Sequence, residues 1–261
     1  MRRGVFWISA LLSGVLVFGL LIMLIEPILI FFPNQKSLNS CSLPEGVRHV
    51  EFSGERGLFT EGNGETLLVF YHGNSESACN WRFLGVNHAR QFGFDTLVME
   101  YPGYSDDPRS IQPSADRITT MIGETHIWAQ ARYSRIVTMG FSLGTGAASI
   151  HAGLDGVDRV ALFAPYQSLF ELAQSKGYPF PKFWFRNNLD SATALTNAQT
   201  PVHVTFGARD RIIPPSRSEA LIRRLDHVGV LVTYRSVPNA GHSDLFGPDA
   251  LNEALRFLRG S

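Results

Sequence analysis

The chain contains, in the order serine, aspartate, histidine, three residue types that together can activate a hydroxyl group. Ser142 stands in Gly140-Phe141-Ser142-Leu143-Gly144, which has the form G-x-S-x-G, and Asp210 and His242 follow it. A serine hydroxyl is a weak nucleophile, so attack on a carbonyl carbon needs a neighbouring base and a carboxylate that orients this base. The order and the pentapeptide therefore predict Ser142 as nucleophile, His242 as base and Asp210 as orienting acid.

The predicted base and acid each follow a predicted strand. His242 lies in Asn239-Ala240-Gly241-His242-Ser243, between the last predicted strand and the last predicted helix, and Asp210 comes just after the apolar run Val202 to Phe206. Loops at strand ends collect functional residues. The alternatives are a surface histidine and a turn or cap aspartate, and Asp244 is a weaker candidate for the acid. The order of all three residues favours catalysis.

Acyl transfer also needs donors for the negative oxygen of its tetrahedral intermediate. The backbone N–H of Leu143, next after the nucleophile, is the first predicted donor. The second is expected in His72-Gly73-Asn74-Ser75, which follows the apolar run Thr66 to Tyr71. We expect Asn74 to supply it, with Ser75 as the alternative, and a purely structural turn is the competing interpretation.

A sharp strand-to-helix turn must position Ser142, so the surrounding elements are expected to alternate between strands and helices. Several predicted strands are continuous apolar runs, which is typical of a parallel sheet covered on both faces. The sequence therefore predicts an α/β fold with a mostly parallel, doubly wound sheet of about eight strands. The predicted strands are His49 to Phe52, Thr66 to Tyr71, Phe94 to Glu100, Arg135 to Phe141, Arg159 to Phe163, Val202 to Phe206 and Val230 to Val237.

Two predicted helices and one loop have readable signals. Ser216 and Glu219 form a possible capping box after Pro214-Pro215, and Pro248 suits the first turn of a last helix. The segment from Glu100 to Ser105 contains Pro-Gly, which marks a turn. This turn follows a predicted strand, and we expect it to form one wall of the site.

The N-terminus contains an uncharged apolar run from Val5 to Ile25. At 1.5 Å per residue it is about 30 Å long as a helix, which matches the hydrocarbon thickness of a bilayer. Glu26 and Pro27 then mark the membrane edge. A cleaved signal peptide is the alternative, but the run is long for one and no A-x-A-like site follows it. We therefore predict a transmembrane signal-anchor helix.

Flanking charges predict the orientation of this helix. Arg2 and Arg3 precede the span, whereas only Lys36 lies close on its far side. The positive-inside rule places the N-terminus in the cytoplasm and the remaining domain in the periplasm or a lumen. The absence of an N-x-S/T sequon fits a bacterial inner-membrane protein.

Composition excludes some partners. Lys plus Arg and Asp plus Glu balance at 23 each, and no basic cluster occurs, so binding of nucleic acid is not expected. The two cysteines, Cys41 and Cys79, lack metal-ligand spacing, and the sequence leaves open whether they pair. The other histidines show no metal-binding spacing, so no metal site is predicted. An oligomeric state is not indicated.

The combined motifs resemble the α/β-hydrolase superfamily, and most of all its membrane-anchored branch with lysophospholipid lipases and depalmitoylating thioesterases. The resemblance runs from about Gly46 to the C-terminus, although Glu100 stands where the family often has Asp. It implies a serine hydrolase with Ser142, Asp210 and His242 as triad, and no metal or organic cofactor. The motifs that carry it are Tyr71-His72-Gly73-Asn74, Tyr101-Pro102-Gly103-Tyr104, Gly140-Phe141-Ser142-Leu143-Gly144, Gly207-Ala208-Arg209-Asp210 and Gly241-His242.

In this family the segment that corresponds to Ser168–Leu189 forms a small lid over the nucleophile. Here it is rich in aromatic residues and interrupted by Pro179 and Pro181, too irregular for one helix. Beside a membrane anchor, such a lid indicates an apolar acyl chain in the substrate, unless it packs only on its own domain. The aromatic residues are Phe170, Tyr178, Phe180, Phe183, Trp184 and Phe185.

These observations predict a membrane-anchored serine hydrolase of a small-molecule or lipid acyl ester or thioester. Two alternatives are a non-catalytic α/β-hydrolase-fold binding scaffold at the membrane and a Rossmann oxidoreductase. The second would use Gly144-x-Gly146, but Ser149 stands where that motif needs Gly or Ala. The expected division is a cytoplasmic tail (1–4), an anchor helix with interfacial extension (5–32), a linker (33–45) and a hydrolase domain (46–261) with its lid at about 168–189.

Overall fold

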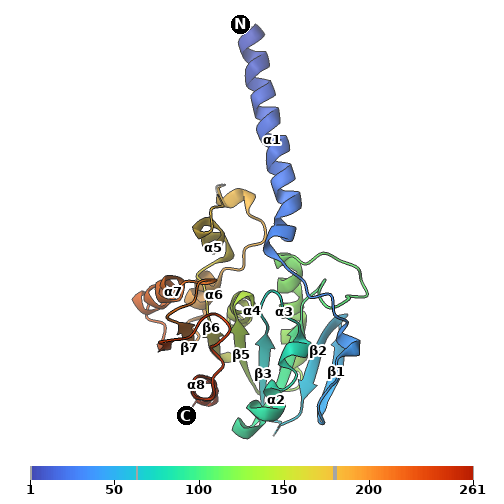
Figure 1. Cartoon of the computed structure of the whole chain (residues 1–261), viewed down its shortest axis with the longest axis vertical. Coiled ribbons are helices and arrows are strands. Elements are labelled where there is room, and N and C mark those ends of the chain that lie inside the picture. The colour runs from blue at the N-terminus through green and yellow to red at the C-terminus, as the bar shows by residue number, and fades with distance from the viewer. Residues whose placement is uncertain (1, 63, 179–180, 261) are drawn as a thin grey trace.

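The sheet has eight strands in the order β1-β2-β4-β3-β5-β6-β7-β8 (Figure 1). β1 and β2 run antiparallel to their neighbours, and every other pair is parallel. The computed structural model describes residues 2–62, 64–178 and 181–260. In the first helix it describes side chains from Ser13 onward, except that of Leu20. The strands are β1 Val47–Phe52, β2 Glu55–Thr60, β3 Thr66–Tyr71, β4 Phe94–Glu100, β5 Arg135–Phe141, β6 Val157–Phe163, β7 Val202–Gly207 and β8 Val232–Val237.

Helices cover both faces of this sheet, as predicted for a doubly wound α/β fold. Alternate residues of β3 point to opposite sides: Leu67 and Val69 join one buried cluster, whereas Leu68 and Phe70 join the other. The α-helices are α1 Arg2–Ile30, α2 Leu84–Asn87, α3 Ala115–Gln130, α4 Leu143–Ala152, α5 Leu169–Ser175, α6 Ser191–Ala198, α7 Pro215–His227 and α8 Pro248–Arg259. Short 3₁₀ helices span Leu38–Ser40, Ala78–Trp81, Ala89–Phe92 and Lys182–Trp184.

Two local predictions differ from the structure. β2 was not predicted, because its sequence Glu-Arg-Gly-Leu-Phe-Thr opens with two charges and a glycine instead of an apolar run. The capping box at Ser216 is wrong: α7 begins at Pro215 without a side-chain cap. Proline lacks the N–H that a first helical position leaves unpaired, so the helix starts before the serine. Pro248 opens α8 as predicted.

α1 projects from the sheet domain as a single long helix (Figure 1). It passes through Pro27 and ends at Ile30. Its segment Ser13–Ile30, with mean hydropathy 2.4, is long and apolar enough to cross a membrane. After it the chain returns along the domain, where Leu38 is buried.

The two cysteines, whose pairing the sequence left open, form a disulfide. Cys41 lies just after the helical turn Leu38–Ser40, and Cys79 lies in the helical turn Ala78–Trp81. Their Cα atoms are 5.9 Å apart. The bond ties the segment after α1 to the segment that follows the loop at Asn74.

Candidate active site

Ser142 occupies the sharp turn between β5 and α4. Its backbone has φ 53° and ψ −117°, a conformation that L-residues rarely adopt and that stores strain. The flanking glycines make this turn possible. A Cβ on Gly140 would collide with the carbonyl of Gly144, and a Cβ on Gly144 would collide with the carbonyl of Tyr71. The strained turn holds the Ser142 hydroxyl beyond the end of the sheet.

The structure brings the three predicted residues into one hydrogen-bond chain. His242 Nε2 lies 2.9 Å from Ser142 Oγ, and His242 Nδ1 lies 2.7 Å from Asp210 Oδ2. The other Asp210 oxygen accepts hydrogen bonds from the backbone N–H groups of Ile212 and Ile213 at 2.8 and 2.9 Å. Asp210 is buried. A buried carboxylate held this way fixes the imidazole with Nδ1 protonated and leaves Nε2 to accept a proton from serine.

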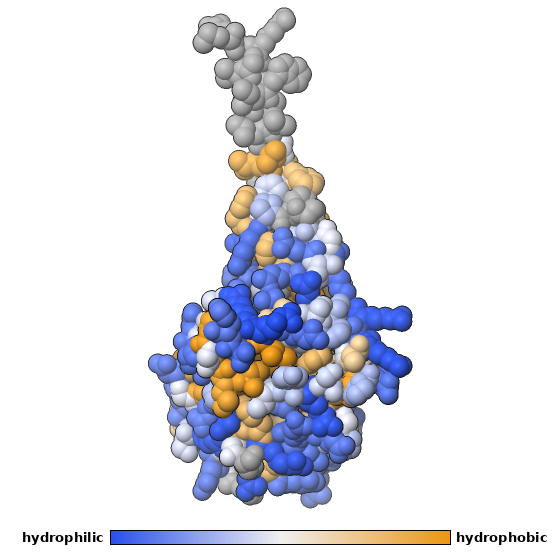
Figure 2. All heavy atoms as spheres, turned by 90° about the vertical axis from the view of Figure 1, so that its left-hand side faces the viewer, coloured by the Kyte–Doolittle hydropathy of each residue, from blue (hydrophilic) through white to orange (hydrophobic). Residues whose placement is uncertain are grey.

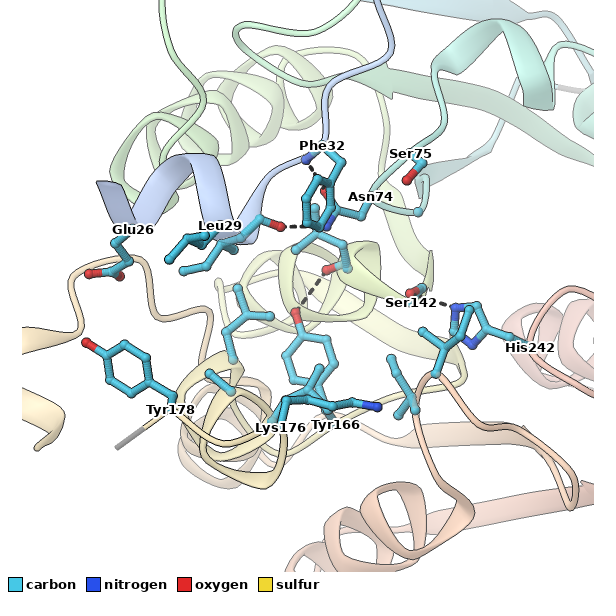
Figure 3. A pocket seen from close by; sticks show the side chains of 18 of the residues that line it. Glu26, Leu29, Phe32, Asn74, Ser75, Ser142, Tyr166, Lys176, Tyr178 and His242 are labelled. Carbon is cyan, nitrogen blue, oxygen red and sulfur yellow. Dashed lines mark hydrogen bonds between the residues drawn. The ribbon is translucent and has the colours of Figure 1, made fainter. Parts of the chain in front are cut away.

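The two predicted oxyanion donors line the same pocket as Ser142. Within the described chain, neither the Leu143 N–H nor the Asn74 N–H donates to another protein group. Ser75, the alternative donor, also borders this pocket (Figure 3). Unpaired N–H groups beside a nucleophile can bind a negative oxygen, and Leu143 begins a helix, whose N-terminus favours negative charge.

The Asn74 side chain is held by three hydrogen bonds. Its oxygen accepts from Phe32 N–H at 3.0 Å, and its amide nitrogen donates to the carbonyl of Ile30 at 2.6 Å (Figure 3). The same oxygen also accepts from the Tyr104 hydroxyl at 2.8 Å. Burial, and then the charge of Glu100, raise the pKa of Tyr104 well above its ordinary value, so the phenol remains a donor. The loop is therefore anchored to the end of α1.

Glu100 and His72 contact both ends of the loop that contains Asn74, a role that the sequence did not indicate. Glu100 accepts a hydrogen bond from Ala78 N–H at 2.9 Å and lies 3.2 Å from His72 Nε2, and both side chains are fully buried. His72 Nδ1 lies 2.8 Å from the carbonyl of Gly73, which can only accept. These contacts join His72 and Glu100 to Gly73 and Ala78, on either side of Asn74. Glu100 ends β4, the strand beside β3, but one of its partners is a backbone N–H, which no residue type marks in the sequence.

A cavity of about 820 Å³ opens in front of Ser142. In Figure 3 it extends from Ser142 and His242 toward Glu26 and Tyr178. Two lining residues were not expected from the sequence. Tyr166, which donates to the Leu143 carbonyl at 3.0 Å, follows β6, and Glu26 comes from α1. A volume of this size suits a small organic ligand.

The predicted lid is irregular, as expected, with α5 and a 3₁₀ turn. Phe170, Tyr178 and Phe185 form an aromatic cluster with ring centroids 5.3 to 6.4 Å apart. Tyr178 and Phe185 also line the cavity, whereas Phe183 is exposed. Phe180 and Pro179 lie outside the described residues. The lid thus packs on itself and faces the cavity with the same cluster.

Across residues 2–62, 64–178 and 181–260, the structure contains no group of three or more His, Cys, Asp or Glu side chains arranged to hold a metal ion. The remaining histidines lie elsewhere. His151, for example, lies 2.8 Å from the Tyr71 hydroxyl and 3.2 Å from His126 in the core. Burial, and then His126, lower the pKa of His151 to about 3, so it is neutral at physiological pH.

Solved structures share this fold. An esterase from Pyrococcus furiosus superposes with a TM-score of 0.65 and 13% identity over 87% of this chain and 94% of its own. Est1E of Butyrivibrio proteoclasticus, solved with ferulic acid bound, superposes with a TM-score of 0.63 and 15% identity over 80% of this chain and 96% of its own. At such identities the likeness shows the α/β-hydrolase fold alone.

Sequence relatives carry the comparison further. Acyl-protein thioesterase 1 of Gibberella zeae is 32% identical over 227 residues, which cover 77% of this chain and 88% of that protein. An uncharacterized protein of Mycobacterium tuberculosis is 26% identical over 88% of this chain and 86% of its own length. Residues 110–248 match the Dienelactone hydrolase family. The chain belongs to this family within the α/β-hydrolase superfamily and is a hydrolase of the esterase type.

Proposed function

We propose that the protein is a serine hydrolase that cleaves a carboxylic ester or thioester by two-step acyl transfer. The observation that carries this proposal is the continuous chain from Ser142 Oγ through His242 to Asp210, at 2.9 and 2.7 Å. A thioester is included because the Gibberella zeae relative is named a thioesterase.

The geometry supports a mechanism in which His242 serves both steps. Its Nε2 takes the proton of Ser142 Oγ while that oxygen attacks the carbonyl carbon, and Asp210 stabilises the imidazolium. The backbone N–H groups of Leu143 and Asn74 bind the oxygen that becomes negative. The imidazolium then gives its proton to the leaving alcohol or thiol. Water, deprotonated by His242, then attacks the acyl carbon, and the imidazolium returns the proton to Ser142 Oγ as the carboxylic acid leaves.

The cavity supports a substrate with an apolar acyl chain. Its walls include Leu169, Leu172 and Ile213 besides the aromatic lid residues. Each buried methylene group adds about 0.8 kcal/mol to binding. We therefore expect medium or long acyl esters to be preferred over acetate esters. A strict preference for short esters would contradict this part of the proposal.

We further propose that α1 anchors the enzyme in a membrane, with the catalytic domain on the periplasmic side of a bacterial inner membrane. Figure 2 shows hydrophobic residues on the described part of α1 and mostly hydrophilic ones where the helix meets the domain. Arg2 and Arg3 favour a cytoplasmic N-terminus. The disulfide between Cys41 and Cys79 suits an oxidising compartment.

Reaction with a fluorophosphonate tests the serine mechanism in the full-length chain in detergent. The reagent should modify Ser142, and Ser142→Ala should lower turnover of a short ester by a factor on the order of 10⁴ to 10⁶. Ser216→Ala, which changes an exposed serine on α7, is the matched control and should keep full activity. Unchanged hydrolysis in Ser142→Ala would exclude the mechanism, and a protein that neither reacts nor hydrolyses any ester would be a binding scaffold.

A further inference from the structure

α1 is packed against the catalytic domain, not merely tethered to it. Glu26 is 2% exposed, and its carboxylate accepts hydrogen bonds from the backbone N–H groups of Arg186 and Asn187 at 2.9 and 2.8 Å. A buried carboxylate needs such donors, so this contact fixes one face of the helix against the lid. Nearer the N-terminus of the same helix, Gly19 packs against the indole of Trp184. A Cβ atom added at Gly19 would lie 3.1 Å from this indole, so the absence of a side chain leaves room for it.

A second attachment lies on the opposite side of the cavity. The Asn74 side chain bridges the Ile30 carbonyl and the Phe32 N–H, so the end of α1 is joined to the loop with the predicted oxyanion donor. Glu26 holds the same helix to the lid. α1 therefore spans the gap between lid and oxyanion loop.

One face of α1 consequently becomes a wall of the cavity. Ile22, Glu26 and Leu29 line it and are spaced i, i+4 and i+7, which places them on one side of a helix. The lid residues Leu172 and Tyr178 line the cavity as well. Figure 3 shows Glu26 and Leu29 of α1 on one side, Tyr178 and Lys176 of the lid on another, and Ser142 with His242 at the far end. Apart from Glu26, whose oxygens are bound to the lid, the helical side of the wall is apolar.

We propose that α1 forms part of the substrate site: the acyl chain of a membrane-resident ester lies along its Ile22–Leu29 face, with the ester carbonyl at Ser142. This inference rests on the proposed serine hydrolase function. Ile22 falls within the segment predicted to cross the bilayer, so the cavity reaches the hydrocarbon layer. An acyl chain then passes from lipid to enzyme without exposing its methylene groups to water, which would be unfavourable for each of them.

Substitutions on the two faces of the same helix test this proposal in the full-length protein in lipid nanodiscs. Ile22→Trp and Leu29→Trp place an indole in the wall. Their matched controls are Ile28→Trp and Leu24→Trp, which alter exposed α1 residues that do not line the cavity. The measured quantity is the ratio of kcat/KM for p-nitrophenyl octanoate to kcat/KM for p-nitrophenyl acetate. Partitioning of the esters into the nanodisc affects wall and control variants equally, so it does not change the comparison between them.

The wall variants should lower this ratio on the order of ten-fold, because an indole fills the space of several methylene groups. The control variants should stay within about two-fold of the unmodified protein. A short-chain fluorophosphonate should react with Ser142 at equal rates in all of them, which reports an intact catalytic site. Leu29→Phe provides a milder wall variant if the larger indole prevents folding, and it should change the ratio in the same direction.

Two other results would separate a failure of this inference from a failure of the serine hydrolase proposal. Equal ratios in wall and control variants, with normal fluorophosphonate labelling, would overturn the role of α1 and leave the serine hydrolase proposal intact. Absence of labelling in the unmodified protein would overturn the serine mechanism, and this inference with it.

Discussion

At the scale of single residues, Asn74 borders the cavity in front of Ser142, and its side chain contacts the end of α1. Its N–H is the proposed second oxyanion donor. Its side chain meets Ile30, Phe32 and Tyr104 through three hydrogen bonds. A donor nitrogen must lie about 2.7 to 3.1 Å from the developing oxyanion to stabilise it, so its position has to be held closely. The side chain of Asn74 is therefore a positioning group for its own backbone.

Replacing Asn74 by alanine should lower kcat for a short ester by a factor of about 10 to 100 and leave KM within about two-fold. The N–H remains, but the loop loses the three bonds that orient it, and a lost oxyanion donor costs about 10² to 10³ in kcat. Tyr104→Phe removes one of these bonds and should have a smaller effect in the same direction. Steady-state kinetics with p-nitrophenyl acetate separate the two constants. A rise in KM at constant kcat would show that the side chain serves substrate binding instead.

The residues that the sequence identified and those that it missed differ in the kind of partner they have. Ser142, Asp210 and His242 were predicted because each partner is a side chain of a required type in a known order. Glu26 binds backbone N–H groups that lie 160 and 161 residues away. Glu100 likewise binds a backbone N–H. Any residue type supplies a backbone group, so no pattern in the sequence indicates such a contact before the fold is known.

At the scale of elements, α1 shows the same division. Its apolar run predicted a helix that could span a membrane, and the structure contains a helix long and apolar enough to do so. Hydropathy averages over all faces, whereas docking depends on the single face that carries Glu26. Glu26 therefore marked only the end of the span in the sequence, although in the structure it is the contact between helix and lid.

Glu26→Gln should loosen this contact. A glutamine can keep the oxygen that accepts from both Arg186 and Asn187, but it loses the negative charge and turns an NH₂ group toward the Arg186 N–H, which lies 3.2 Å from the second Glu26 oxygen. Hydrogen bonds to a charged group contribute about 1.5 to 3 kcal/mol. The lid should then open more often, and trypsin should cleave after Lys176 or Lys182 several-fold faster. Glu45→Gln, at an exposed acid of the linker, is the control. Mass spectrometry of the fragments over time gives the rates, and equal rates in both variants would argue against the contact.

At the scale of the whole molecule, three connections join α1 and the segment after it to the sheet domain around one cavity. The segment at Arg186 and Asn187 binds Glu26, the loop at Asn74 binds the end of α1, and the disulfide ties the following linker to the 3₁₀ helix Ala78–Trp81. The disulfide closes a chain segment with a sequence separation of 38 residues. Such a bond restricts the unfolded chain, and it joins the linker after α1 to the segment that follows the Asn74 loop.

The double variant Cys41→Ser/Cys79→Ser should therefore lose about 3 to 4 kcal/mol of unfolding free energy, the chain-entropy estimate for a loop of this length. For a domain of this size that corresponds to a Tm lower by roughly 10 °C. Reductant should lower the Tm of the unmodified protein similarly and leave the Tm of the double variant unchanged, which separates the effect of the disulfide from general effects of reductant.

Alkylation of the cysteines in membranes prepared without reductant tests the orientation of the protein. A catalytic domain on the periplasmic side should show no free thiol, because the cytoplasm would keep both cysteines reduced; two alkylated cysteines would contradict both the disulfide and the proposed orientation.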